Sequence, residues 1–209
     1  MRRCLLLLGL VGLAGIWLGP LPEQAQYSFV AHMVLHIGLV AVLAPLIAVG
    51  LAGSRVDPVC TAPRLFTPIP AALAEMVIVW GWHAPLVHQF TRLTPWLLVL
   101  EQLSFLAVGL WVWLAAFGGD LSQRAARAGG GIIGLLLTSM HMTLLGALLT
   151  LAPRPLYFQC SVSDQQLGGV IMLIGGGIAY LLGGLWLLRD MLRESTDTQC
   201  IPPTREETW

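Results

Sequence analysis

Long apolar runs recur along this chain of 209 residues, and their length limits the folds that it can adopt. A helix needs about 20 residues to cross the hydrocarbon core of a bilayer, which is about 30 Å thick. Only 11% of the residues are charged, whereas soluble domains carry about 25%. The sequence therefore predicts an all-α protein, a polytopic bundle of transmembrane helices within the lipid bilayer.

Short connections separate the apolar runs and leave little room for a soluble catalytic domain. We expect a single helical domain over residues 1–193, followed by a polar, disordered tail over residues 194–209. The run at 5–18 follows two arginines, as in a signal peptide, but no A-x-A cleavage site follows it, so that we expect a retained helix or signal anchor. About six helices are predicted: Leu5–Leu18, Phe29–Leu51, Leu65–Trp82, Pro95–Phe117, Gly130–Leu151 and Leu167–Leu188.

Arginines indicate the orientation, because cytoplasmic segments of membrane proteins carry an excess of basic residues. Every basic residue of this chain is an arginine. If the N-terminus lies inside, nine of the 11 arginines fall on inner segments, and only Arg92 and Arg154 fall outside. We therefore expect both termini in the cytoplasm, with residues 83–94 and 152–165 on the outer side.

The histidines gather toward this outer side. His32 and His36 are one turn apart on one helix face, separated by about 6 Å along the axis. His83 ends the third predicted helix, His88 lies in the outer loop that follows, and His141 lies in the middle of the fifth. Taken singly, His32 and His141 could form interhelical hydrogen bonds and His88 could be a solvated loop residue. The His32/His36 pair makes metal ligation an equally good interpretation.

Two acids, Glu75 and Glu101, lie inside apolar helices. An ionisable group there costs at least about 2.5 kcal/mol at the bilayer centre, so that such residues are functional candidates by default. The simpler alternative is that each acid only joins neighbouring helices.

Methionines accompany two of the histidines: Met33 follows His32, and Met140 and Met142 flank His141. Thioether and imidazole ligands together suit copper, especially Cu(I). Adjacent residues diverge by about 100° around a helix, so that only one of Met140 and Met142 can share the face of His141. Packing is the commoner role of a buried methionine, and the pattern suggests copper without proving it.

Other function classes find little support. A net charge of zero gives no basis for nucleic-acid binding. The cysteines form no CxxC pair and therefore indicate neither a zinc ribbon nor a disulfide framework, although Cys160 in the outer loop could contact a metal. No spacing indicates a catalytic triad, and we expect that the protein is not an enzyme.

The chain contains four stretches that together resemble one family: HMVLHIGLVAVLAPLIAVG, WHAPLVH, HMTLLGALLTLAPRPLY and DQQLGGVIM. They are similar to the CtaG-type cytochrome c oxidase assembly factors, bacterial polytopic membrane proteins linked to copper insertion into haem-copper oxidases. The resemblance covers nearly all of residues 31–180. It implies a multi-pass metallochaperone of the bacterial inner membrane and its respiratory chain, with oxidase subunits and a copper donor protein as partners.

The resemblance also implies which residues form the site. The family's histidines fall on His32, His36, His83 and His141, whereas His88 falls in a more variable loop. The acid of the DQ motif is Asp164. The chain departs from many relatives in carrying Gln102 where they have a histidine, and in having fewer helices.

Together these observations predict a copper site, of undetermined valence, in the outer half of the bundle. The expected metal ligands are His32, His36, His83 and His141, with Met33, Met140, Met142 and His88 as further candidates and Glu101, Asp164 and Glu75 as acids that orient the imidazoles.

Three alternatives stay open. The first is a b-type cytochrome with axial histidines. The second is a transporter for copper or protons, with Glu75 and His141 as a relay. The third is a chaperone that packs against an oxidase subunit and binds no metal.

Overall fold

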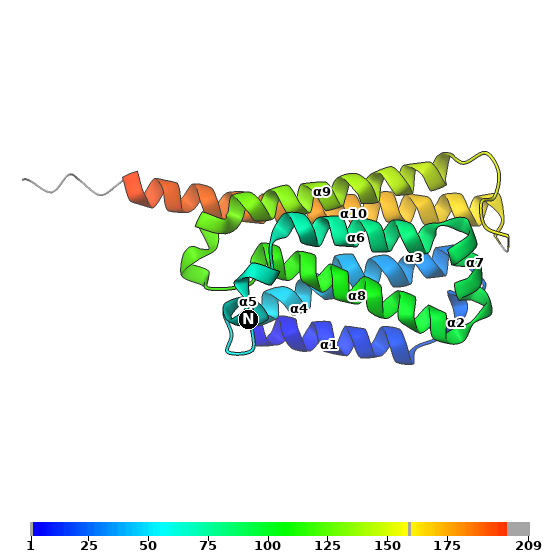
Figure 1. The fold of residues 1–209 in the computed structure, drawn as a ribbon, viewed down its shortest axis with the longest axis horizontal. Coiled ribbons are helices and arrows are strands. Elements are labelled where there is room, and N and C mark those ends of the chain that lie inside the picture. The colour runs from blue at the N-terminus through cyan, green and yellow to red at the C-terminus, as the bar shows by residue number, and fades with distance from the viewer. Residues whose placement is uncertain (1, 159, 200–209) are drawn as a thin grey trace, which may run out of the picture.

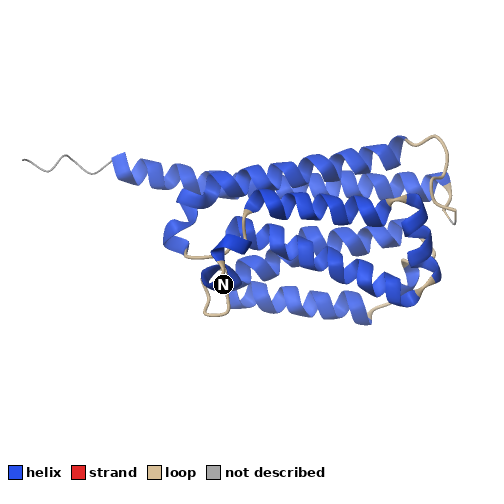
Figure 2. Ribbon diagram, in the orientation of Figure 1, coloured by secondary structure: helices blue, strands red, loops and turns tan. Residues whose placement is uncertain are grey.

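The computed structural model describes residues 2–158 and 160–199, and every regular element among them is a helix (Figures 1 and 2). The long helices lie side by side, and the loops gather at the two ends of the bundle (Figure 2). The elements are α1 (Arg2–Leu18), α2 (Leu21–Gln24), α3 (Phe29–Ile37), the π-helical turn η1 (Gly38–Leu43), α4 (Ala44–Leu51), α5 (Pro58–Thr61), η2 (Pro63–Leu65), α6 (Pro68–His83), α7 (Pro85–Leu93), α8 (Pro95–Phe117), η3 (Leu121–Gln123), α9 (Arg124–Leu151) and α10 (Val162–Gln199).

Within the described residues, four helical segments are long and apolar enough to cross a membrane: Phe29–Leu51 (α3 to α4), α8, α9 and α10. The pair α6 and α7 would supply a fifth span, but the two helices are bent by 69°. α1 has 17 residues and packs against α4. These long segments agree with the predicted bundle of about six helices, and the chain is a multi-pass membrane protein.

Prolines set the start of several helices, because a first-turn residue needs no N–H and proline already has a helical φ. α6 begins at Pro68, three residues after the predicted start at Leu65, and α8 begins at Pro95 as predicted. The outer loop predicted over residues 83–94 was wrong in part. Pro85 starts a new helix there, α7, which lies across the end of the bundle (Figure 1).

The last two helices are longer than predicted. α9 begins at Arg124, and α10 runs from Val162 to Gln199. At 1.5 Å per residue α10 is about 57 Å long, well beyond the thickness of a hydrocarbon core. Residues 194–199, predicted as the start of a disordered tail, are helical, and residues 200–209 lie outside the described part of the chain.

A π-helical turn interrupts the helix that carries His32 and His36. The N–H of Ala44 binds the carbonyl of Leu39, five residues earlier. Pro45, the next residue, has no N–H to continue an ordinary helical ladder, which favours this wider turn. The turn begins two residues after His36 and so ends the regular helix face on which both histidines lie.

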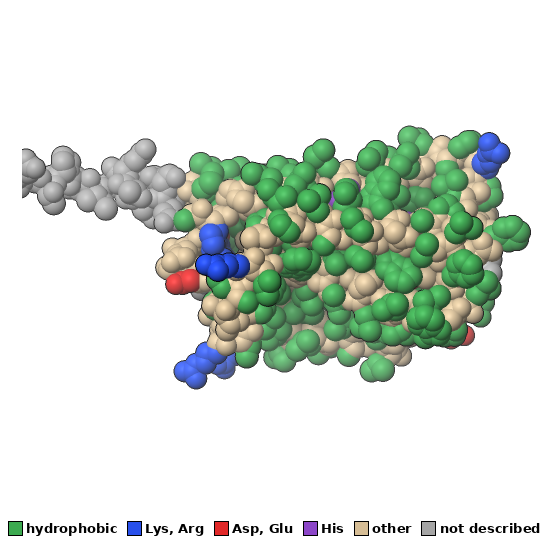
Figure 3. All heavy atoms as spheres, viewed as in Figure 1, with side chains coloured by type: hydrophobic (Ala, Val, Ile, Leu, Met, Phe, Trp, Pro, Cys, Tyr) green, Lys and Arg blue, Asp and Glu red, His purple; other side chains and the backbone are tan. Residues whose placement is uncertain are grey.

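Close helix contacts hold the bundle together. Where α9 meets α10, a Cβ atom at Gly146 would lie 2.7 Å from the backbone nitrogen of Leu173, so that only glycine allows this approach. On the face seen in Figure 3 the molecular surface is largely hydrophobic, and the charged side chains lie toward the two ends. We call the end with residues 19–28, α7 and residues 152–158 the outer end, and the opposite one the inner end (Figure 1).

Candidate metal centre

Four of the five histidines meet inside the outer end of the bundle. His32 and His36 come from α3, His83 ends α6, and His88 lies on α7; all four are buried. The ring centroids of His32 and His88 are 4.9 Å apart, those of His36 and His83 are 5.3 Å apart, and those of His32 and His83 are 5.4 Å apart. We call these four residues the histidine cluster.

The bend between α6 and α7 builds half of this cluster. α6 ends at His83, Ala84 adopts an extended backbone, and Pro85 starts α7 in a new direction. The turn brings His88 back toward His32. The expectation that His88 is a solvated loop residue was therefore wrong, because its side chain is buried on the inner face of a helix.

Most of the imidazole nitrogens in the cluster have no hydrogen-bond partner. Both nitrogens of His36, Nε2 of His32, Nε2 of His83 and Nδ1 of His88 are buried and unpaired. His83 donates Nδ1–H to the carbonyl of Val79 at 2.7 Å, and its bare Nε2 is therefore the atom left to bind a ligand. Buried polar atoms are normally paired, and such a concentration of exceptions calls for a functional explanation.

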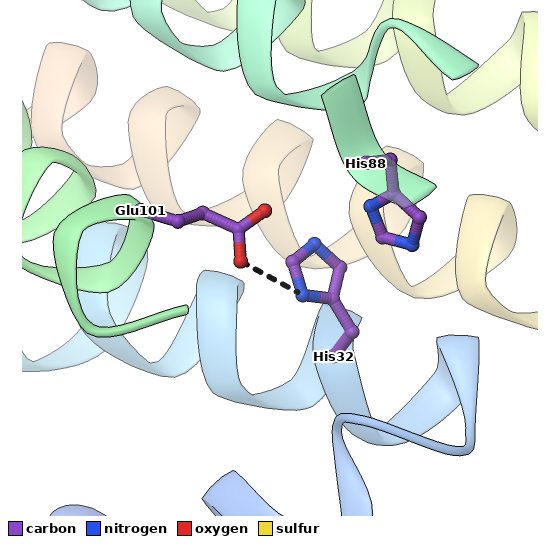
Figure 4. A group of neighbouring side chains, drawn as sticks. All are labelled: His32, His88 and Glu101. Atoms are coloured by element: carbon purple, nitrogen blue, oxygen red, sulfur yellow. Dashed lines mark ion pairs between the residues drawn. The ribbon is translucent and has the colours of Figure 1, made fainter. Parts of the chain in front are cut away.

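One acid completes the group. Among the described residues, His32, His88 and Glu101 form a set whose possible ligand atoms all lie within 4.8 Å of one another (Figure 4). Nδ1 of His32 and Oε2 of Glu101 are 3.8 Å apart. Gln102 donates its amide N–H to the same Oε2 at 3.1 Å. Imidazole nitrogens with a carboxylate oxygen form a donor set that suits divalent or monovalent transition metals.

Arg92, which the sequence analysis did not identify as a site residue, joins the acid to the cluster. Its Nη2 lies 2.8 Å from Oε2 of Glu101 and 3.0 Å from Nδ1 of His32, and its Nη1 donates to the carbonyl of Ala25. The signal in the sequence was faint: Arg92 is one of only two arginines expected outside, and it follows His88 by one helical turn.

Aromatic rings surround the cluster and were also missed from the sequence. Phe105 of α8 lies 4.2 Å from His36, centroid to centroid, and Tyr157 lies 4.4 Å from His88. The hydroxyl of Tyr157 donates to the carbonyl of His83 at 2.9 Å. These contacts restrict the orientation of the imidazole rings.

His141, which the family resemblance implies as a ligand, stays apart from the cluster. Its side chain is buried in α9, both ring nitrogens are unpaired, and it is close enough to His36 for an electrostatic interaction. It makes no ring contact with the four clustered histidines among the described residues.

The methionines do not extend the donor set. Met140 is 65% exposed on the outside of α9, which removes it from the list of candidate ligands. Met33 and Met142 are buried, but both pack against glycines of α10, Gly168 and Gly176 respectively. Their environment is that of packing residues.

Two of the three predicted acids also lie away from the imidazoles. Asp164 accepts hydrogen bonds from the hydroxyl of Ser28 and from the N–H groups of Phe29 and Val30, so that it caps α3 and positions the helix that carries His32. Glu75 accepts from the hydroxyl of Tyr180 at 2.9 Å. Glu101 alone of the three reaches the cluster.

A small pocket lies beside the cluster at the outer end. Part of its lining is formed by Ser28, His88, Arg92, Tyr157 and Cys160. The thiol of Cys160 is half-buried. Burial raises the pKa of this thiol to about 11, so that the sulfur keeps its proton near neutral pH. His88 is the member of the histidine cluster that lines this pocket, so that the pocket reaches one edge of the cluster.

Comparison with known proteins gives one match. The family model of the cytochrome c oxidase caa3 assembly factor (Caa3_CtaG) matches residues 1–194. No curated protein and no solved structure matches the chain.

Proposed function

Because the chain belongs to the cytochrome c oxidase caa3 assembly factor family, we propose that it binds copper in the histidine cluster and assists its insertion into the oxidase. His32, His88 and Glu101 would hold the ion first. His83 and His36, with their unpaired nitrogens, would complete the coordination or receive the ion in turn. Copper is the cargo of this protein.

The observation that carries the proposal is the set of unpaired nitrogens in four buried imidazoles. Leaving a buried polar group without a partner costs about 1–3 kcal/mol. Several such groups in one place therefore lower the free energy of unfolding substantially. A neutral imidazole has one bare nitrogen, and a bound metal ion would accept its lone pair and offset part of that cost. Imidazole and carboxylate also bind zinc, and it is the assembly of a copper-containing oxidase that favours copper.

The spacing of the rings argues against a haem. A b-type site needs two histidines on opposite sides of a flat macrocycle. Here the closest imidazole centroids are 4.9 to 5.4 Å apart, and Phe105 lies 4.2 Å from His36. No macrocycle fits between rings packed at these distances, whereas a single ion does.

Delivery requires ligands that exchange. Histidines and one carboxylate hold copper less permanently than a closed cage of thiolates, and the outer pocket opens directly beside His88. We therefore propose loading from a copper donor protein and handover to an oxidase subunit, both at the outer face of the bacterial inner membrane.

Metal content of the detergent-purified protein tests the binding step. After loading with Cu(I) and removal of excess, elemental analysis should give about one copper ion per chain, and an absorbance scan should give no Soret band. The double variant His32→Ala/His88→Ala should lose the copper, and Met140→Ala, which alters an exposed side chain, should keep it. Equal copper in all three proteins would contradict the proposal.

Complementation tests the assembly step. In a strain that lacks this protein, the wild-type chain should restore copper to the oxidase and His32→Ala/His88→Ala should not. If the double variant restores the copper fully, the protein assists assembly through protein contacts alone.

A further inference from the structure

Arg92 lies where it would compete with a metal ion. Its guanidinium carries a positive charge and is buried against the histidine cluster, with Nη2 3.0 Å from Nδ1 of His32 and 2.8 Å from Oε2 of Glu101. Both residues belong to the group of possible metal ligands. A cation that occupies the space between two ligand atoms excludes a second cation from the same space.

The hydrogen bond to His32 also decides which of its nitrogens can bind a metal. A guanidinium has donors only, so that Nδ1 of His32 must accept, and the neutral ring therefore carries its proton on Nε2. The lone pair of Nδ1 is engaged by Arg92, and Nε2 has none to offer. Moving the proton to Nδ1 would leave Nε2 with a free lone pair. It would also place the Nδ1–H of His32 against an N–H of Arg92, and two donors repel each other. His32 therefore has no lone pair for a metal while Arg92 stays in position.

We propose that Arg92 is a cationic gate, which must leave His32 and Glu101 before copper can bind to them. The inference rests on the proposed function and adds a step to it. Arg92 also lines the outer pocket together with Cys160 and Tyr157, and this pocket is the direction in which the guanidinium would turn. In the closed arrangement the arginine neutralises Glu101, and on loading the metal ion takes over that role.

The same side chain connects the site to the surface. Nη1 of Arg92 donates to the carbonyl of Ala25, in the segment that leads from α2 to α3. Release of the guanidinium would therefore also break this hydrogen bond between α7 and residues 19–28. Copper loading would therefore loosen residues 19–28, at the end where we propose that handover takes place.

Cu(I) affinity, measured by competition with a chromogenic chelator in detergent, tests the gate. Arg92→Gln removes the competing cation and leaves the carboxylate of Glu101 without its positive partner. The affinity for Cu(I) should therefore rise at least about tenfold, or about 1.4 kcal/mol. Arg154→Gln is the matched control, because it removes the same charge from an exposed position at the same end, and its affinity should equal that of the wild type. An affinity of Arg92→Gln equal to or below that of the wild type overturns the gate.

Hydrogen exchange of the wild-type protein gives a second test that needs no variant. Copper loading should speed amide exchange in residues 19–28, which lose the hydrogen bond to Arg92, while exchange in the inner half of α9 stays constant. Slower or unchanged exchange in residues 19–28 overturns the gate even if copper binds. If neither the wild type nor Arg92→Gln binds copper, the proposed function itself fails, and the gate fails with it.

Discussion

Asp57 at the inner end and the histidine cluster at the outer end are both buried polar sites, but their hydrogen bonding is opposite. Asp57 accepts from three backbone N–H groups, those of Gly53, Val59 and Gly119, at 2.7 to 2.9 Å. His36 has no partner for either ring nitrogen. A buried polar group whose hydrogen bonds are all made stabilises the loops that it joins. A buried polar group without partners can still bind a ligand. The contrast indicates a structural role for Asp57 and leaves His36 available to a ligand.

The largest effect on folding is expected at Asp57. Asp57→Ala leaves three N–H groups without an acceptor and should lower the free energy of unfolding by about 3 kcal/mol. Reversible unfolding in mixed micelles measures this loss, and copper per folded chain should stay at the wild-type level. Asp190→Ala, which breaks a partly exposed ion pair with Arg124, should change stability by only about 0.5 kcal/mol. Similar losses in both variants would remove the contrast between the two ends.

A comparison of His88 with His141 sharpens the outer site. His88→Ala should lower copper affinity at least about tenfold, because His88 belongs to the set of close ligand atoms. His141→Ala should have a smaller effect, since His141 stays outside the ring contacts of the cluster. Chelator competition on both variants measures the difference. A larger loss for His141→Ala would mean that the metal lies deeper, between α3 and α9.

Replacing His36 tests whether this residue serves copper binding at the expense of stability. If its nitrogens are unpaired in the metal-free protein, His36→Leu should raise the stability of that form by about 1 kcal/mol, because an apolar side chain has no polar group to leave unsatisfied. Copper binding should weaken at the same time. Thermal unfolding with and without copper shows both changes, and destabilisation of the metal-free form would identify His36 as a structural residue.

The smallest effect is expected at Asp164. Asp164→Ala removes the cap of α3 and should lower stability by about 0.5 to 1 kcal/mol. Copper per folded chain should remain unchanged, since the carboxylate touches no imidazole. A selective loss of copper with intact stability would return Asp164 to the group of acids that orient the ligands.

The sequence predicted an all-helical membrane bundle because hydropathy and bilayer thickness leave few choices, and its count of about six helices is close to the four or five spans of the described residues. It predicted the ends less well. The polar stretch HQFTRL indicated a solvated loop, yet it folds as α7, which turns one face inward and so buries His88 and Arg92. Local composition cannot show this, because the burial depends on a bend of 69° at Ala84 and Pro85.

Site residues whose relative positions follow from local helix geometry could be predicted from the sequence. Those brought together by tertiary packing could not. One helical turn between His32 and His36 predicted a shared face, and their rings lie nearly parallel, at 9° to each other. The ion pair of Arg92 with Glu101 joins α7 to α8 across the break between Leu93 and Pro95. No rule of residue spacing predicts this ion pair. The roles of these residues in binding copper stay predictions until metal is measured.

The position of the histidine cluster at one end of the bundle has an energetic consequence for the ion. Moving one elementary charge across the whole membrane against 100 mV takes about 2.3 kcal/mol. An ion that enters and leaves through the outer pocket crosses only a small part of that field. Loading and release should then be almost independent of the membrane potential, and copper delivery should continue when an ionophore dissipates it.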